Sequence, residues 1–327
     1  MESETKHVIK QKKIIDVLDI LGETLTIYFK NINFIIFTLL TSLPFFFIMV
    51  YFETLFQQIL VQTPNIISNL PFQERNQLRF YSIVNHKFIY NGPSFSKDYL
   101  PLLIQLGFIY TIPLHFLEFC SKVLTMDLAS KLINSEENPK MSLKHMFQNS
   151  VDVSIMKGTF VTSLYTLALS NCLLIAFPWT VSNCFIFTRW CYIIFGTVCF
   201  VAVGKLLMIY LESSAIWNMS LVISVLEGIY GTGALKGSYY FSSGNQKRGL
   251  VLMLVFFVFG GVLRLMCIYF ECYKGGSGIF IQIGILTVVN TLKWVSCVIY
   301  FNDCKERKME KKIDEEMGKA KLESNSY

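Results

Sequence analysis

The sequence has few charged residues, and this shortage indicates the class of protein. Asp, Glu, Lys and Arg together make up 16% of the 327 residues, whereas a soluble domain contains about 25%. Hydrophobic residues make up 53%, which is typical of a membrane protein. A nucleic-acid-binding protein would gather the net charge of +6 on a basic face, so no nucleic-acid partner is expected.

Signatures of catalysis and of bound cofactors are also missing. The nine cysteines show no CxxC or Cys/His spacing typical of zinc, so we predict no metal site and no cofactor. We predict neither a catalytic residue nor an enzymatic activity, because no nucleophile with an adjacent base is evident. The first 30 residues show no short apolar core followed by a small-residue cleavage site. We therefore expect the first apolar run to act as its own uncleaved insertion signal.

The sequence contains six long apolar runs. They cover residues 34–52, 99–120, 159–179, 191–211, 249–270 and 278–301. Each has roughly 19–24 residues, and a helix that rises about 1.5 Å per residue needs about 20 to cross a hydrocarbon core of about 30 Å. We predict an all-α polytopic membrane protein with a six-span domain, 34–301, and an outer loop, 53–98. A cytosolic arm, 1–33, precedes this domain, and a charged cytosolic tail, 302–327, follows it.

Lysine and arginine are distributed unequally around these runs. Of the 29 such residues, 20 lie in the two terminal segments and the even-numbered loops, six lie in the odd-numbered loops, and three lie within the runs. Basic residues accumulate on the cytosolic side, so we predict that both termini are cytosolic. The endoplasmic reticulum and the plasma membrane both fit, because no retention or transit signal is legible.

A mixed polar and apolar stretch precedes each run that crosses outward. In the first stretch, Leu18, Leu25 and Tyr28 are expected to share one face of an interfacial amphipathic helix. The three stretches align at Leu21, Phe147 and Leu235, and again three positions later at Thr24, Ser150 and Ser238. This alignment suggests a threefold repeat of an interfacial helix followed by a hairpin of two spans. The alternative is three amphipathic helices that share no repeat.

One of these stretches carries a family resemblance. Residues 217–244, WNMSLVISVLEGIYGTGALKGSYYFSSG, contain a V-x-S-V-L-E core that begins at Val222, then a glycine and Ala-Leu-x-x-Ser. Together with DILGETLTIYFKN at residues 19–31 and Pro44, this resembles a plant-specific family of multi-pass transmembrane proteins of uncharacterised activity. Some members are labelled as partners of a poly(A)-binding protein, but no residue here accounts for that binding. The helix-and-hairpin unit is more distantly similar to the membrane domain of some bacterial glycerophosphodiester phosphodiesterases.

Four polar residues within the runs form the candidate site. They are His115, Glu118, Lys205 and Lys293. His115 and Glu118 are three residues apart and share a helical face, and we expect Glu118 to pair with Lys293. Two readings stay open: the lysines snorkel to the cytosolic interface, or the cluster lines a polar cavity open to the cytosol. Arg264, in the outer half of the fifth run, is expected to reach the outer surface.

The glycine-rich segment 231–237, GTGALKG, imitates a dinucleotide-binding loop. Such a loop needs a preceding strand, whereas the segments around this one are predicted to be helices. We therefore expect Gly231, Gly233 and Gly237 to form a hinge beneath the fifth run.

These features predict a non-enzymatic membrane scaffold, or a factor for trafficking or membrane organisation. Its expected partners are the lipid bilayer and other membrane proteins, or further copies of the same chain. The alternative is a small-solute or ion transporter or channel whose cavity contains the polar cluster.

Overall fold

The computed structural model describes residues 17–69, 101, 104–134, 153–187, 192–272 and 277–324. This part of the chain is helical, which confirms the predicted all-α class. Its elements are α1 (Val17–Lys30), α2 (Ile32–Asn69), η1 (Tyr110–Leu114), α5 (His115–Asn134), α7 (Val153–Phe187), α8 (Tyr192–Leu226), α9 (Thr232–Ser242), α10 (Gln246–Tyr269) and α11 (Ser277–Ser324).

Five of these helices contain a segment long and apolar enough to cross a membrane. The segments are Ile32–Val61, Ser154–Phe177, Gly196–Leu226, Gln246–Tyr269 and Ser277–Ile313. They agree with five of the six predicted runs. The second run begins at residue 99, and residues 99, 100, 102 and 103 lie outside the described part, so the sixth span stays a prediction. The threefold repeat also stays a prediction, since the stretch before α7 falls largely outside the described residues.

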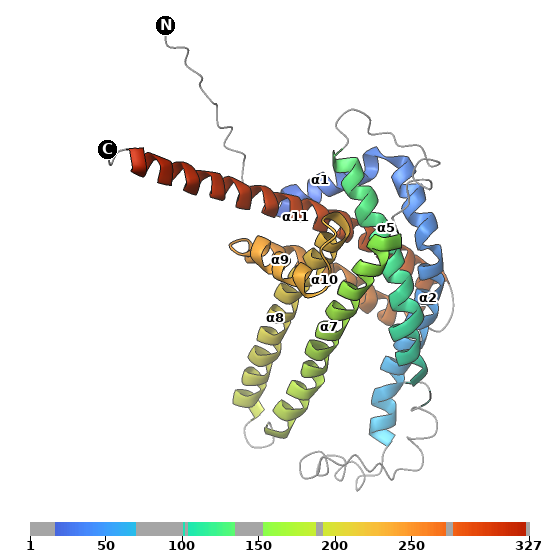
Figure 1. Ribbon diagram of the computed structural model, residues 1–327. Coiled ribbons are helices and arrows are strands. Elements are labelled where there is room, and N and C mark those ends of the chain that lie inside the picture. The colour runs from blue at the N-terminus through green and yellow to red at the C-terminus, as the bar shows by residue number, and fades with distance from the viewer. Residues whose placement is uncertain are drawn as a thin grey trace.

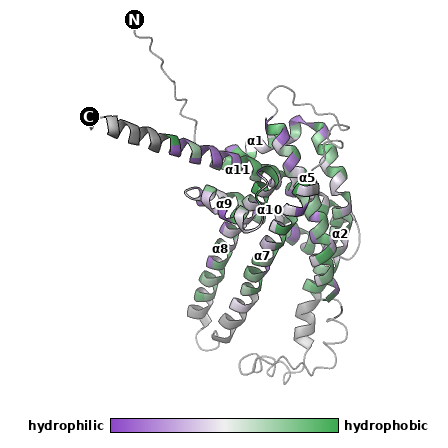
Figure 2. Ribbon diagram, in the orientation of Figure 1, coloured by the Kyte–Doolittle hydropathy of each residue, from purple (hydrophilic) through white to green (hydrophobic). Residues whose placement is uncertain are grey.

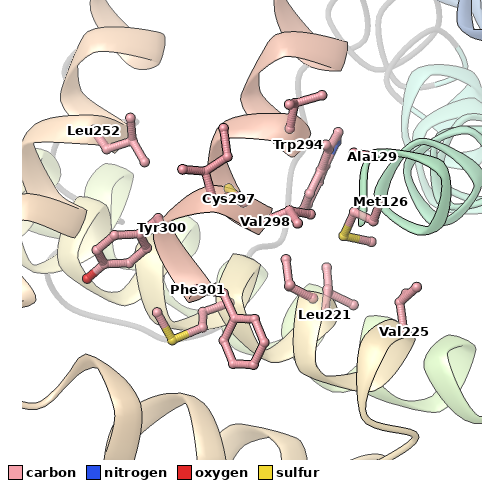
Figure 3. Packing of buried hydrophobic residues seen from close by; sticks show 14 of the residues in the cluster. Met126, Ala129, Leu221, Val225, Leu252, Trp294, Cys297, Val298, Tyr300 and Phe301 are labelled. Carbon is pink, nitrogen blue, oxygen red and sulfur yellow. The ribbon is translucent and has the colours of Figure 1, made fainter. Parts of the chain in front are cut away.

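Helix α11 is the central element of the fold. It packs against α1, α2, α5, α8, α9 and α10. Within an 18-residue stretch of its apolar segment, 56% of the residues are buried. The corresponding share in each of the other four spans is at most 22%. Figure 3 shows Trp294 and Phe301 of α11 among Met126 of α5 and Leu221 of α8. The spans of α2, α8 and α10 therefore pack around α11, and all the other spans leave most of their apolar surface free to contact lipid or other membrane proteins.

Helices α7 and α8 form a hairpin that stands beside this bundle (Figure 1). The hairpin is fastened to α9 by the hydroxyl of Thr162, which accepts hydrogen bonds from Ser224 Oγ (2.9 Å) and from the backbone N–H of Gly231 (2.8 Å). Gly158 permits the close approach, because a Cβ atom there would lie 2.4 Å from the ring of Tyr230.

Three helical segments lie crosswise to α7 and α8 at one end of the bundle, which we call the α9 end (Figure 1). They are α1, α9 and residues 302–324 of α11, which we call the tail helix. The boundary that we predicted at residue 302 lies inside a continuous helix, because neither glycine nor proline occurs between Gly284 and Gly318. Hydrophilic residues gather on the tail helix, whereas α2, α7 and α8 are largely hydrophobic (Figure 2).

One further boundary and one helix face differ from expectation. Helix α2 continues to Asn69, so the first part of the predicted outer loop, 53–98, is helical, and the remainder lies outside the described residues. In α1, Tyr28 is buried whereas Leu18 and Leu25 are exposed, so the predicted shared face is wrong. The buried face instead includes Ile20 and Thr24, and Thr24 bonds to Ser296 of α11 at 2.9 Å.

Candidate functional sites

The predicted polar residues of the second run lie at the start of α5. The preceding turn, η1, is a π-helical turn that contains Pro113. Proline has no backbone N–H, so it cannot donate the regular helical hydrogen bond to the carbonyl four residues earlier. Wide π-helical turns occur where this series of hydrogen bonds is interrupted. From this turn onward His115, Glu118 and Lys122 follow at spacings of three and four residues, which places them along one side of α5.

Glu118 lies closest to Lys122 rather than to the predicted partner Lys293. Its Oε1 atom is 3.9 Å from Lys122 Nζ, an ion pair formed by the usual contact between positions four apart in a helix. Both lysines lie over the indole ring of Trp294, with Nζ–centroid distances of 4.6 Å for Lys293 and 5.5 Å for Lys122. We call these four residues the lysine–tryptophan cluster. Lys122 lies beyond the predicted end of the second run, and burial lowers its pKa although the Glu118 carboxylate opposes this shift.

Of the other two predicted residues, Lys205 lies apart from this cluster, whereas His115 lies beside it on α5 but bonds to another helix. Lys205 is exposed on α8 and has no ion-pair partner within the described residues. His115 is buried and its Nε2 atom lies 3.2 Å from Ser163 Oγ of α7. A serine beside a histidine can serve nucleophilic catalysis, but the Ser163 side chain is fully buried, so an ester carbonyl cannot reach it in this conformation. The contact acts as a hydrogen bond between α5 and α7.

A second polar cluster, which the sequence analysis missed, joins α2, α10 and α11. Arg264 donates to both carboxylate oxygens of Glu53, from Nε at 2.7 Å and from Nη2 at 2.9 Å. Gln57 Nε2 donates to Glu53 Oε1 at 3.0 Å and to Gln282 Oε1 at 3.1 Å. We call these four residues the glutamate–arginine cluster. Glu53 and Gln57 are fully buried, and the Arg264 side chain is 38% exposed.

We had predicted that Arg264 reaches the outer surface. Its side chain is instead bonded to Glu53. Its guanidinium forms a bidentate pair, the strong geometry for an arginine with a carboxylate, and it also lies 5.2 Å from the Phe56 ring centroid. The sequence contained a usable signal, because Glu53 and Gln57 are four residues apart at the outer end of the first run. We had assigned Glu53 to a loop, which removed it from consideration as an intramembrane charge.

Ion pairs fix the base of the tail helix at the α9 end. Asp303 accepts from Arg248 Nη1 at 3.0 Å and from Arg307 Nε at 2.9 Å. Lys305 Nζ donates to Glu227 at 2.6 Å, and Lys308 lies over the Tyr240 ring of α9. These contacts link α11 to the start of α10, to the turn after α8 and to α9.

The three glycines that we predicted as a hinge do not behave alike. Gly231 precedes α9 with a φ of 61°, and Gly228, which we had not selected, has a φ of 66°. These two residues form the turn between α8 and α9, because positive φ suits glycine. Gly233 and Gly237 lie within α9.

No family model, curated protein or solved structure matches this chain. The resemblance to the plant family therefore stays a prediction.

Proposed function

We propose that this protein is a non-enzymatic membrane-organising protein that places helices of its α9 end into the surface of one leaflet. The observation that carries the proposal is that the three crosswise segments at this end each expose large apolar or aromatic side chains. A helix that lies in the membrane surface buries its apolar face about 5–10 Å into the boundary between headgroups and acyl chains. Several such helices on one leaflet occupy area there and favour a curved membrane.

Helix α1 provides the clearest interfacial surface. Its exposed side chains include Leu18 (76%), Leu25 and Phe29 (69%), and Ile32 continues this line at the start of α2. Spacings of seven and four residues place Leu18, Leu25 and Phe29 on one side of α1. Because the opposite face of α1 packs against α11, this apolar stripe is free to contact lipid.

Helix α9 and the tail helix add to the same end. In α9, Tyr239 is 61% exposed and Lys236, three residues earlier, is also exposed. Tyrosine and lysine are typical of the membrane–water interface. In the tail helix, Met309 and Ile313 are both exposed and are four residues apart, so they lie on one side among the basic residues.

Ion pairs fix the tail helix to the bundle. The pair of Asp303 with Arg248 of α10 and the pair of Lys305 with Glu227 after α8 hold the tail helix at its exit from the most buried span. The α9 end therefore occupies a fixed additional area in its leaflet, and this difference in area between the two leaflets can curve the membrane. The lysine and arginine distribution supports a cytosolic location for this end, in either the endoplasmic reticulum or the plasma membrane.

Partition between flat and curved membrane tests this function. The labelled full-length protein is reconstituted in giant vesicles, a narrow tube is pulled, and the protein-to-lipid fluorescence ratio is compared between tube and vesicle. We expect enrichment in the tube for molecules whose α9 end faces outward. The variant Leu18→Ser/Phe29→Ser should lose this enrichment, and the matched variant Leu18→Met/Phe29→Leu should keep it. Equal partition of the wild-type protein would contradict the proposal.

Transport is the second candidate function, and the glutamate–arginine cluster is the observation that favours it. Ionisable residues within spans commonly mark ion or proton pathways, and Glu53 is a fully buried carboxylate. Ion and proton flux can be measured in the same vesicles with the wild-type protein and Glu53→Gln. Flux that requires Glu53 would support a transporter, whereas the organising function predicts equal leakage for both proteins.

A further inference from the structure

The lysine–tryptophan cluster contains one positive charge more than it contains negative charge. Lys122 and Lys293 face a single carboxylate, Glu118, and within the described residues Lys293 has no carboxylate within ion-pair distance. His115, on the same side of α5, is bonded to Ser163. The Lys122 side chain is only 7% exposed. A buried charge is costly unless it is paired, so this cluster favours an additional anion.

Hydrogen-bond donors in the cluster also lack acceptors. The 3.9 Å separation of Lys122 Nζ and Glu118 Oε1 is too long for a direct hydrogen bond. Trp294 is 2% exposed, and its indole Nε1 is a buried donor without a partner. The glutamate–arginine cluster also contains a donor without an acceptor, Gln282 Nε2, but its one carboxylate is matched by one guanidinium, since both Glu53 oxygens accept bonds from Arg264.

These donors lie around one aromatic ring between two helices. Figure 3 shows the Trp294 side chain extending from α11 toward Met126 and Ala129 of α5. Lys122 precedes these residues by four and seven positions, so it lies on the same side of α5. Glu118 is 32% exposed on its side chain and Lys293 is also partly exposed, which leaves one edge of the cluster open.

We propose that the lysine–tryptophan cluster binds the phosphate group of an anionic phospholipid. Phosphate oxygens can accept hydrogen bonds from several donors at once, and lysine binds phosphate as a point charge. Lys293 precedes Phe301, the predicted end of the sixth run, by eight residues, or about 12 Å at the helical rise. A phospholipid reaches this level with its acyl chains already in the surrounding bilayer, whereas free phosphate must enter from water. The site does not depend on the proposed effect on membrane shape.

Binding to full-length protein in detergent tests this site. The probes are short-chain phosphatidic acid, short-chain phosphatidylcholine and inorganic phosphate, and the readout is the dissociation constant together with the lipid-dependent rise in melting temperature. We expect phosphatidic acid to bind more tightly than phosphatidylcholine. Lys293→Met should weaken binding about tenfold or more, because a hydrogen bond to a charged group is lost. Trp294→Phe, which keeps an aromatic ring but removes the N–H donor, should weaken it about threefold.

Glu118→Gln gives the distinguishing result. Removal of the competing carboxylate should tighten binding at least about threefold, an effect that loss of a merely structural contact would not produce. Lys205→Met, which removes an exposed lysine of α8, should leave binding unchanged. Binding of inorganic phosphate that is lost in Lys293→Met would support the phosphate site with a free anion as its source. Equal affinity for the two lipids, or unchanged affinity in Lys293→Met, would overturn the proposal.

Discussion

Removal of Arg264 should destabilise the protein more than removal of its partner Glu53. The variant Arg264→Met leaves the Glu53 carboxylate fully buried with only the Gln57 amide as a donor. An uncompensated buried charge of this kind costs about 3–5 kcal/mol. The Arg264 side chain is 38% exposed, so in Glu53→Gln the guanidinium can turn toward polar surroundings. We expect that variant to lose only about 1–2 kcal/mol.

Thermal unfolding in detergent measures the difference. For Arg264→Met we expect the melting temperature to fall by roughly 6–20 °C, using about 2–4 °C for each kcal/mol. The double variant Glu53→Gln/Arg264→Met should lie above Arg264→Met, because no buried charge remains. The coupling energy should reach on the order of 1–3 kcal/mol.

A basic residue of another span provides the control. Lys205→Met removes a charge from α8 that has no ion-pair partner within the described residues, and it should change stability by less than about 0.5 kcal/mol. Near-neutral single variants with an additive double variant would refute the conclusion that Glu53 and Arg264 form a desolvated pair.

Three further predictions concern the α9 end. Gly158→Ala should destabilise the α7–α8 hairpin by about 1–3 kcal/mol through its clash with the Tyr230 ring, and the same change should be almost neutral in a Tyr230→Ala background, as measured by thermal unfolding. Asp303→Asn should loosen the tail helix because the charged hydrogen bond from Arg248 of α10, worth about 1.5–3 kcal/mol, is weakened. Faster proteolysis of the tail would reveal this, and an unchanged cleavage rate would contradict the role of this residue. Asn218 should carry no glycan although it begins an N-x-S sequon, because its side chain bonds to Ser214 and Met253 inside the bundle; a mobility shift on glycosidase treatment that is absent in Asn218→Gln would contradict this.

The membrane helices could be predicted from the sequence because their length and apolar composition reflect one constraint. In lipid, every backbone N–H and C=O group must form its hydrogen bond within the helix. Placing a charged side chain in the hydrocarbon core costs free energy, so the apolar runs contain few charged residues. The five candidate spans therefore agree with the predicted runs. The ends of α2 and α11 could not be found in this way, since both helices continue beyond the apolar segment.

The polar contacts were less predictable because they depend on tertiary packing. The spacing of Glu118 and Lys122 allows an ion pair, but we had looked for a partner on another helix. The pair of Glu53 with Arg264 joins residues 211 positions apart, and no local pattern identifies it. In α1, Leu18 and Tyr28 looked equivalent in the sequence, yet only Tyr28 is buried, with its ring against Phe34 of α2.

The depth of the α9 end in the membrane is the measurement that tests the proposed function most directly. Spin labels at Phe29, Tyr239 and Met309 sample α1, α9 and the tail helix in turn, in a background without reactive cysteines. Collision rates with oxygen and with a water-soluble nickel chelate give the depth of each label in reconstituted bilayers. We predict that all three lie about 5–10 Å below the lipid phosphates. Labels that collide with the nickel chelate as freely as in bulk water would contradict the account.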